Sequence, residues 1–184
     1  LYISECEAPH RCYVENITEY GSRLIQIIQF RIENKPQAVH DWIVDRETNH
    51  IYAVTQLYPF NKERNGFATQ IVKFNLPSIN IPQVILSDVD IEDSFEVFFP
   101  HILQGGVIHN HTLYFPSGAS ADSQLQYGKE KAIVIIDLKE KKIKRIIDVQ
   151  DILNNEPEGG AFWGKSLIIS CAPKGLYQFF LKDE

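Results

Sequence analysis

Short apolar segments recur along the whole chain, and clusters of turn-forming residues separate them. Valine, isoleucine, tyrosine and phenylalanine are enriched in these segments, which is typical of β-strands. The apolar period of a long helix is missing throughout, and residues 148–155 predict at most one helical turn. The pattern therefore predicts an all-β protein built from antiparallel strands.

Four parts of the chain share one local order: an apolar strand, a turn and a second apolar strand. A third strand follows in the first three parts, and a further strand precedes the last three. Together they form a four-strand repeat with an uneven period of about 55 residues. The predicted first strands are 1–4, 51–54, 113–116 and 167–170, the second 12–16, 69–76, 132–138 and 175–181, the third 24–32, 83–86 and 143–149, and the preceding ones 39–45, 105–109 and 159–163.

Repeated four-stranded antiparallel units are typical of a β-propeller. One such sheet cannot bury both of its faces, and stacking the sheets around an axis gives each sheet two apolar neighbours. A β-sandwich also contains alternating strands, but the strand order recurs in phase here, which favours the propeller. We expect blades at 1–36, 37–98, 99–153 and 154–184.

The strand count predicts an incomplete ring. The first blade lacks its opening strand and the last blade its closing strand, which leaves about three and a half blades, whereas closed rings have roughly four to eight. Because the chain begins inside an apolar run and contains no Met, we expect a processed or trimmed chain that belongs to a larger ring. The alternatives are an irregular four-bladed ring and self-association of incomplete rings.

Polar residues precede the predicted inner strand in three successive blades. The inner strands of a propeller line its central channel, so the loops that lead into them meet on one face. Imidazole and carboxylate groups gathered there could bind one divalent cation, Ca²⁺, Mn²⁺ or Zn²⁺, or act as a general acid and base. The predicted ligand-binding residues are His40, Asp41, His101, Gln104, Glu156 and Glu158, and the predicted metal ligands among them are His40, His101, Glu156 and Glu158.

A purely structural role is the alternative for the same residues. Polar groups in a propeller channel often only bind water or hydrogen-bond between blades. The glycine pairs at 105–106 and 159–160 have a structural explanation too, because paired glycines let inner strands pack closely at the crowded axis. Residues 117–120 lack the nucleophile elbow of serine hydrolases, so no catalytic residue is assigned.

Two long insertions are predicted to rise from one face of the propeller. They span residues 57–67 and 118–129 and carry Tyr58 and Tyr127. Long loops of this kind often carry binding residues. Exposed aromatic side chains beside Asn and Gln suit a carbohydrate or a peptide, so we add these two tyrosines to the predicted ligand-binding residues.

Composition and charge exclude several other classes. The net charge of 18 − 24 = −6 argues against a nucleic-acid footprint, and no apolar run has the roughly 20 residues of a membrane-spanning helix. The acidic run 88–93 does not fit an EF-hand and predicts a solvated loop, while the basic cluster 139–145 predicts an exposed hairpin. Cys6 and Cys12 are close enough to bridge a hairpin in an oxidising compartment; otherwise the cysteines are small buried apolar residues.

Three segments resemble those of a known group of propellers: residues 40–45 (HDWIVD), 101–106 (HILQGG) and 156–160 (EPEGG). They are similar to segments of uncharacterised secreted propellers of gut Bacteroidetes, which are distantly similar to NHL-like, lactonase-like and glutamine-cyclotransferase-like propellers. The resemblance lies at the level of the repeats. It implies a propeller fold and an extracytoplasmic setting, whether secreted, periplasmic or surface-associated.

We therefore expect an extracytoplasmic module that uses the channel mouth and the long loops to bind a small molecule, a glycan or a protein. The alternative is a metal-dependent, lactonase-like hydrolase. In that enzyme, the predicted metal ligands would hold the cation or serve as acid–base groups.

Overall fold

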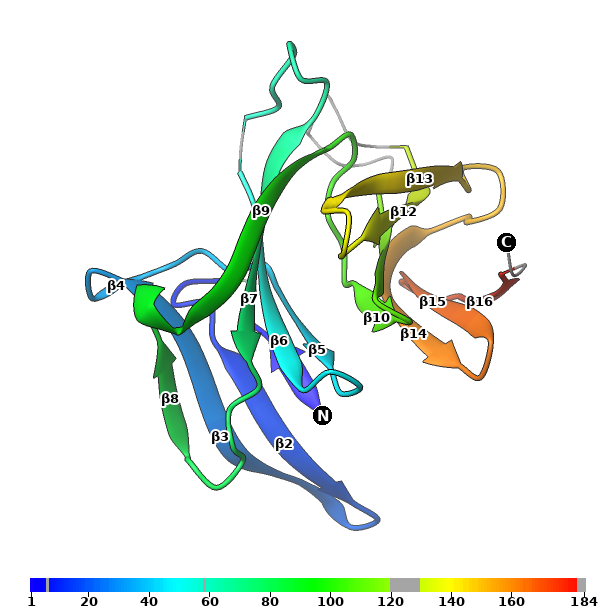
Figure 1. Ribbon diagram of the computed structural model, residues 1–184. Coiled ribbons are helices and arrows are strands. Elements are labelled where there is room, and N and C mark those ends of the chain that lie inside the picture. Colours follow the sequence, from blue (N-terminus) through cyan, green and yellow to red (C-terminus); the bar gives the residue numbers. More distant parts are fainter. Residues whose placement is uncertain (6, 58, 120–129, 182–184) are drawn as a thin grey trace. The chain divides into compact units, whose positions relative to one another are not determined.

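The computed structural model describes residues 1–5, 7–57, 59–119 and 130–181. Strands make up almost all of the regular structure in these ranges, and the exception is a single 3-10 turn, η1 (Asp88–Asp90) (Figure 1). Within the same ranges, no helix is long and apolar enough to cross a membrane. The prediction of an all-β protein is confirmed.

The strands form four small antiparallel sheets, and β3 and β8 form a parallel pair within the first of them. Sheet 1 contains β1 (Tyr2–Ser4), β2 (Cys12–Thr18), β3 (Gly21–Ile32), β4 (Lys35–Pro36) and β8 (Gln83–Leu86); sheet 2 contains β5 (Asp41–Asp45), β6 (His50–Gln56), β7 (Phe67–Asn75) and β9 (Ile91–Phe99); sheet 3 contains β10 (Val107–His109), β11 (Thr112–Ser117), β12 (Ala132–Asp137) and β13 (Lys142–Asp148); and sheet 4 contains β14 (Glu156–Trp163), β15 (Ser166–Ala172) and β16 (Leu176–Phe180).

Sheets 2, 3 and 4 run in simple chain order, each strand pairing with the next one of its own sheet. Tight turns make several of these connections, such as those between β5 and β6 and between β12 and β13, because antiparallel neighbours need only a short turn between them. Small sheets of this kind are the blades of propellers. The fold class predicted from the repeats is thus confirmed at the level of the individual sheets.

The chain divides into two compact units, 1–56 with 70–96 and 57–69 with 97–184. In the first unit, sheets 1 and 2 share one apolar core. Ile28 and Phe30 of β3 and Phe74 of β7 are at most 4% exposed in it. The rings of Phe30 and Phe74 meet edge to face, with their centroids 5.0 Å apart.

In the second unit, sheets 3 and 4 share a core in the same way. Ile133 and Ile135 of β12 pack in one cluster with Leu167 and Ile169 of β15. Full burial of each such side chain is favourable by about 1.5–3 kcal/mol, and a three- or four-stranded sheet standing alone would forgo that gain. Packing against a neighbouring sheet is therefore what makes each small sheet stable.

One strand assignment from the sequence was wrong. Residues 83–86 were expected to complete the second blade, but they form β8, which pairs in parallel with Ile27 to Phe30 of β3 in sheet 1. The Gln26 side chain supports this placement, because its Nε2 donates hydrogen bonds to the carbonyls of Ser78 (2.7 Å) and Ile81 (2.8 Å) just before β8. An apolar strand of four residues carries no information about which neighbour it joins.

Strand β9 completes sheet 2 in place of residues 83–86. The acidic run 88–93 was predicted to be a solvated loop, but its first half forms η1 and its second half begins β9. Its residues alternate between half-buried and exposed positions before both faces become covered near Phe99. Glu92 on this strand accepts a hydrogen bond from His50 Nε2 at 2.9 Å and pairs with Lys73 Nζ at 3.3 Å. These contacts attach an acidic edge strand to β6 and β7.

Two of the three cysteines lie among the described residues, and both Cys12 and Cys171 are buried free thiols. Burial raises the pKa of Cys12 to about 12, so this thiol stays protonated and unreactive at neutral pH. This agrees with the expectation of small buried apolar residues. Cys6 lies outside the described residues.

The same turn chemistry closes hairpins in both units. Asp45 Oδ1 accepts hydrogen bonds from the backbone N–H groups of Glu47 (3.0 Å) and Thr48 (3.3 Å), and its Oδ2 accepts one from Thr48 Oγ1 (2.6 Å). Asp137 likewise accepts from the N–H groups of Glu140 and Lys139, and these bonds lower its pKa. The Asp137 turn is the exposed basic hairpin that the sequence predicted.

We predict that Asp45→Ala destabilises the protein by about 1–3 kcal/mol, because Asp45 is only 4% exposed and its three donors would lose their acceptor. Asp137→Ala is the matched control and should cost less, because its turn is open to water. Urea unfolding of both variants measures the difference. Equal losses would contradict the burial argument.

Candidate functional site

Two of the predicted polar positions meet in the second unit. The segment 101–106, which leads into β10, lies against the start of β14. Gln104 Nε2 donates hydrogen bonds to Glu156 Oε1 at 3.0 Å and to the carbonyl of Gly118 at 2.8 Å. The Gln104–Glu156 bond joins residues 52 positions apart in sequence, as the repeat phase predicted for neighbouring blades.

A second link between the same segments runs through the backbone. The N–H of Gly105 donates to the carbonyl of Glu158 at 3.0 Å. Glu158 occupies a β-bulge, because Pro157 pairs with Cys171 whereas Gly159 already pairs with Ser170. Bulges of this kind change the direction of a side chain and are common beside functional sites.

The carboxyl groups of Glu156 and Glu158 influence each other. Burial raises the pKa of Glu158, and the negative charge of Glu156 raises it further. Gln104 holds one oxygen of the Glu156 carboxylate, while the Glu158 side chain is exposed. The arrangement therefore places two carboxylates beside each other at one end of sheet 4, a pattern that favours a positively charged neighbour.

The close approach of segment 101–106 to β14 requires a glycine at position 105. A Cβ atom at position 105 would lie 2.8 Å from the Glu158 carbonyl oxygen and 3.1 Å from Gly159 Cα. Position 159 itself is different, since a Cβ there would lie 3.6 Å from Ser170 Oγ, an ordinary contact. The structural explanation offered for the glycine pairs thus holds for Gly105. In the second pair it applies to Gly160, where a Cβ would lie 3.2 Å from Val107 Cγ1 and 3.3 Å from Pro116 Cγ, and not to Gly159.

His101 belongs to the same segment but has other charged neighbours. Burial lowers its pKa, while the charges of Glu130 and Asp148 act in the opposite direction. We therefore expect a neutral imidazole at pH 7.

His40 and Asp41 lie in the first unit, where their contacts are structural. Asp41 Oδ1 accepts a hydrogen bond from Ser4 Oγ at 2.9 Å, and the same Oγ accepts one from the Trp42 N–H at 2.8 Å. His40 Nδ1 accepts one from the backbone N–H of Gln56 at 3.2 Å. Burial lowers the pKa of His40, and the nearby His10 ring adds to this effect.

The predicted metal set is not assembled within either unit. His40 lies in the first unit, whereas His101, Glu156 and Glu158 lie in the second. Among the described residues, no three His, Cys, Asp or Glu side chains are placed to hold a metal ion together. The metal site and the hydrolase alternative stay predictions, and Tyr58 and Tyr127 lie outside the described residues.

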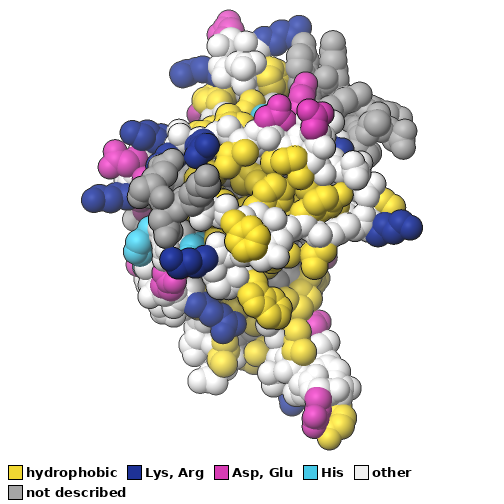
Figure 2. Space-filling view, turned by 90° about the vertical axis from the view of Figure 1, so that its right-hand side faces the viewer, with side chains coloured by type: hydrophobic (Ala, Val, Ile, Leu, Met, Phe, Trp, Pro, Cys, Tyr) yellow, Lys and Arg dark blue, Asp and Glu magenta, His cyan; other side chains and the backbone are white. Residues whose placement is uncertain are grey.

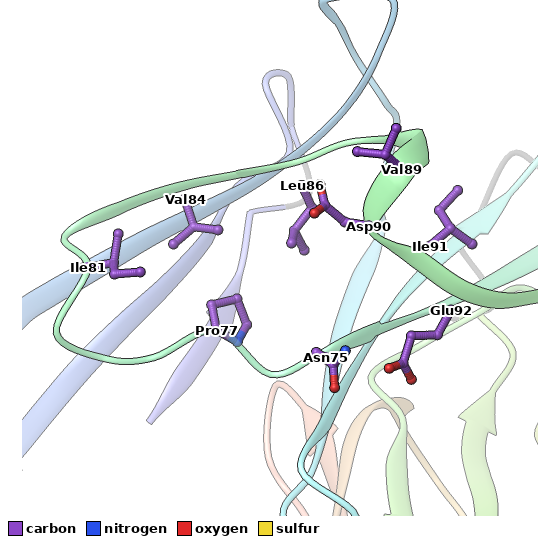
Figure 3. Close-up of a pocket in the computed structure, with 9 residues that line it drawn as sticks. All are labelled: Asn75, Pro77, Ile81, Val84, Leu86, Val89, Asp90, Ile91 and Glu92. Carbon is purple, nitrogen blue, oxygen red and sulfur yellow. The ribbon is translucent and has the colours of Figure 1, made fainter.

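The first unit contains a pocket that sequence reasoning missed (Figure 3). Its volume is about 360 Å³, and one side of it is apolar while Asn75, Asp90 and Glu92 supply polar atoms. Both carboxylates already have partners, since Asp90 Oδ2 accepts bonds from the N–H and Oγ of Ser87 and Glu92 pairs with His50 and Lys73. The apolar lining residues are Pro77, Ile81, Val84, Leu86, Val89 and Ile91.

The sequence carries no clear signal for this pocket. Its wall forms because β8 joins β3 of sheet 1. That pairing is not encoded in a local pattern. The polar groups of the pocket are engaged in holding η1 and β9, so we assign it no ligand.

Comparison with known proteins adds little to this description. No protein-family model matches the chain, and no curated protein matches it either. Among solved structures, the crystal structure of the computationally designed Ika4 protein is similar at 9% sequence identity and a TM-score of 0.38, over 84% of this chain and 98% of that chain. The fold class therefore rests on the strands and sheets themselves.

We predict that Gly105→Ala destabilises the protein by about 1–3 kcal/mol, because the added methyl group would collide with backbone atoms that cannot move independently. Gly159→Ala is the matched control, and its stability should change by no more than about 0.5 kcal/mol. Denaturant unfolding of both variants provides the measurement. A neutral Gly105→Ala would show that the two segments do not approach as closely as described.

Proposed function

We propose that the protein is a non-enzymatic binding module that works outside the cytoplasm and binds a positively charged group of its ligand between Glu156 and Glu158. The observation that carries the proposal is the geometry of the pair: Glu158 is exposed on a β-bulge two residues from Glu156, whose carboxylate accepts a hydrogen bond from Gln104 Nε2 at 3.0 Å. The raised pKa of Glu158, due to burial and to the charge of Glu156, agrees with this arrangement. Two adjacent carboxylates repel each other, and a bound cation relieves that repulsion.

The position of Glu158 supports binding of a ligand. Glu158 is exposed on its bulge, so a ligand can reach it from solvent. Neutral amide donors such as Gln104 orient a carboxylate without cancelling its charge.

The class of ligand follows from this chemistry. An ammonium or guanidinium group on a small molecule or on a peptide side chain would pair with the carboxylates, and so would a hard divalent cation. A small molecule, a glycan or a protein could carry that cationic group, and the part that Tyr58 and Tyr127 play in binding it stays a prediction. The resemblance to secreted Bacteroidetes propellers supports the extracytoplasmic setting.

Calorimetric titration with Ca²⁺, Mn²⁺, Zn²⁺ and 1,4-diaminobutane tests the proposal. We expect at least one of these probes to bind, and Glu158→Gln to weaken that binding about tenfold or more, because a charge-assisted contact contributes about 1.5–3 kcal/mol. Glu19→Gln, in the exposed turn between β2 and β3, is the matched control and should bind like the unmodified chain.

The pH dependence gives a second readout of the same site. The pKa of Glu158 is raised above the usual 4.5, so binding should weaken as the pH falls through this raised value, sooner than for an ordinary glutamate. Absence of binding by every probe at pH 7 would overturn the cation proposal. Binding that Glu158→Gln leaves unchanged would move the site elsewhere.

A further inference from the structure

Sheet 4 has fewer strands than the other sheets. Sheets 2 and 3 have four strands each, whereas the described part of sheet 4 has three. Its last strand, β16, pairs with β15 on one side, and no described strand pairs with its other side. The edge of β16 therefore presents backbone N–H and C=O groups that a further strand could bind.

The composition of β16 differs from that of β13 and β9, the outer strands that end sheets 3 and 2. Proteins usually protect an exposed edge with charged residues, and β13 (KIKRIID) and β9 (IEDSFEVFF) follow this rule. The sequence of β16 is LYQFF, without any charge. Leu176 and Phe180 are nonetheless 75% and 77% exposed, so β16 has the composition of an inner strand in an outer position.

The surface next to this edge is apolar as well. Phe180 pairs with Ser166, which in turn pairs with Trp163, so Phe180 and Trp163 lie on one face of sheet 4. Trp163 is 82% exposed. Figure 2 shows the side of the molecule that carries sheet 4 in Figure 1, and hydrophobic side chains gather there in one broad area.

The backbone register shows which groups are available. The N–H of Cys171 donates to the carbonyl of Gly175 at 3.0 Å. Because hydrogen-bonded pairs alternate along an antiparallel ladder, the pairs Ile169–Tyr177 and Leu167–Phe179 continue this bonding. The backbone groups of the remaining β16 residues, Leu176, Gln178 and Phe180, consequently point toward the open edge.

We propose that β16 pairs in antiparallel fashion with β16 of a second copy of this chain, about a two-fold axis at Gln178. This register places Leu176 opposite Phe180 of the second copy and uses the outward backbone groups of both strands. It joins three strands from each copy into one continuous sheet. An isologous interface of this kind closes as a dimer and does not propagate into fibres.

Charge favours self-pairing of β16 over self-pairing of β13, the last strand of sheet 3. The same two-fold pairing at the centre of β13 would place Arg145 against Arg145 of the second copy, with further lysines on either side. Like charges directly opposite each other destabilise a strand pair. In β16 the central pair is Gln178 with Gln178, and all flanking side chains are uncharged.

Sedimentation equilibrium of the intact chain tests the proposal. At about 100 µM chain, we expect a mass of twice 21.2 kDa. Phe180→Lys places like charges along the edge, and Gln178→Pro removes an outward N–H group, so each should weaken dimerisation at least about tenfold. Ile146→Lys adds the same charge at an exposed position on β13 and should leave the dimer intact.

Hydrogen exchange of the unmodified chain provides a readout that does not depend on the folding of a variant. The amides of Leu176, Gln178 and Phe180 should be protected in the dimer and should exchange faster when dilution separates the copies. A monomer at all concentrations would overturn the proposal. A dimer that persists in both folded β16 variants would overturn it as well.

Discussion

The structure depends on face-to-face packing between small neighbouring sheets. Each sheet has three to five described strands, several of them short, and its apolar residues are buried against the other sheet of the same unit. In the first unit this packing brings Phe30 against Phe74, and in the second it brings Ile133 and Leu167 into one cluster. Backbone hydrogen bonds define each sheet, but burial between sheets provides the free energy that keeps it folded.

This packing also positions the candidate site. When sheets 3 and 4 stack, the segments that lead into their first strands are drawn together, and Gln104 reaches Glu156. The contact is possible because Gly105 has no side chain where it meets the Glu158 carbonyl. The carboxylate pair is thus a consequence of sheet stacking combined with one bulge and one glycine.

Much of the fold could be predicted from the sequence because the strands and their repeated order depend on local patterns of apolar and turn-forming residues. Short apolar runs rich in isoleucine mark strands such as β12 and β15. The phase of the repeat predicted that Gln104 and Glu156 would meet. The assignment of β8 failed because its four residues do not specify a partner strand, and β9 was mistaken for a loop because its acidic residues lie at exposed positions of a strand. His40 was predicted as a ligand, yet its ring nitrogen holds the backbone of Gln56. A polar residue has the same appearance in sequence whether it binds a ligand or the chain itself.

The Gln104–Glu156 hydrogen bond joins sheets 3 and 4 and also positions a carboxylate of the candidate site. A double-mutant cycle on this pair therefore tests most directly whether sheet packing positions the site. The measurement is the unfolding free energy of Gln104→Ala, Glu156→Ala and the double variant. If the two side chains hold the segments together, the losses of the two single variants will sum to about 1 kcal/mol more than the loss of the double variant. Losses that add within about 0.3 kcal/mol would contradict the account.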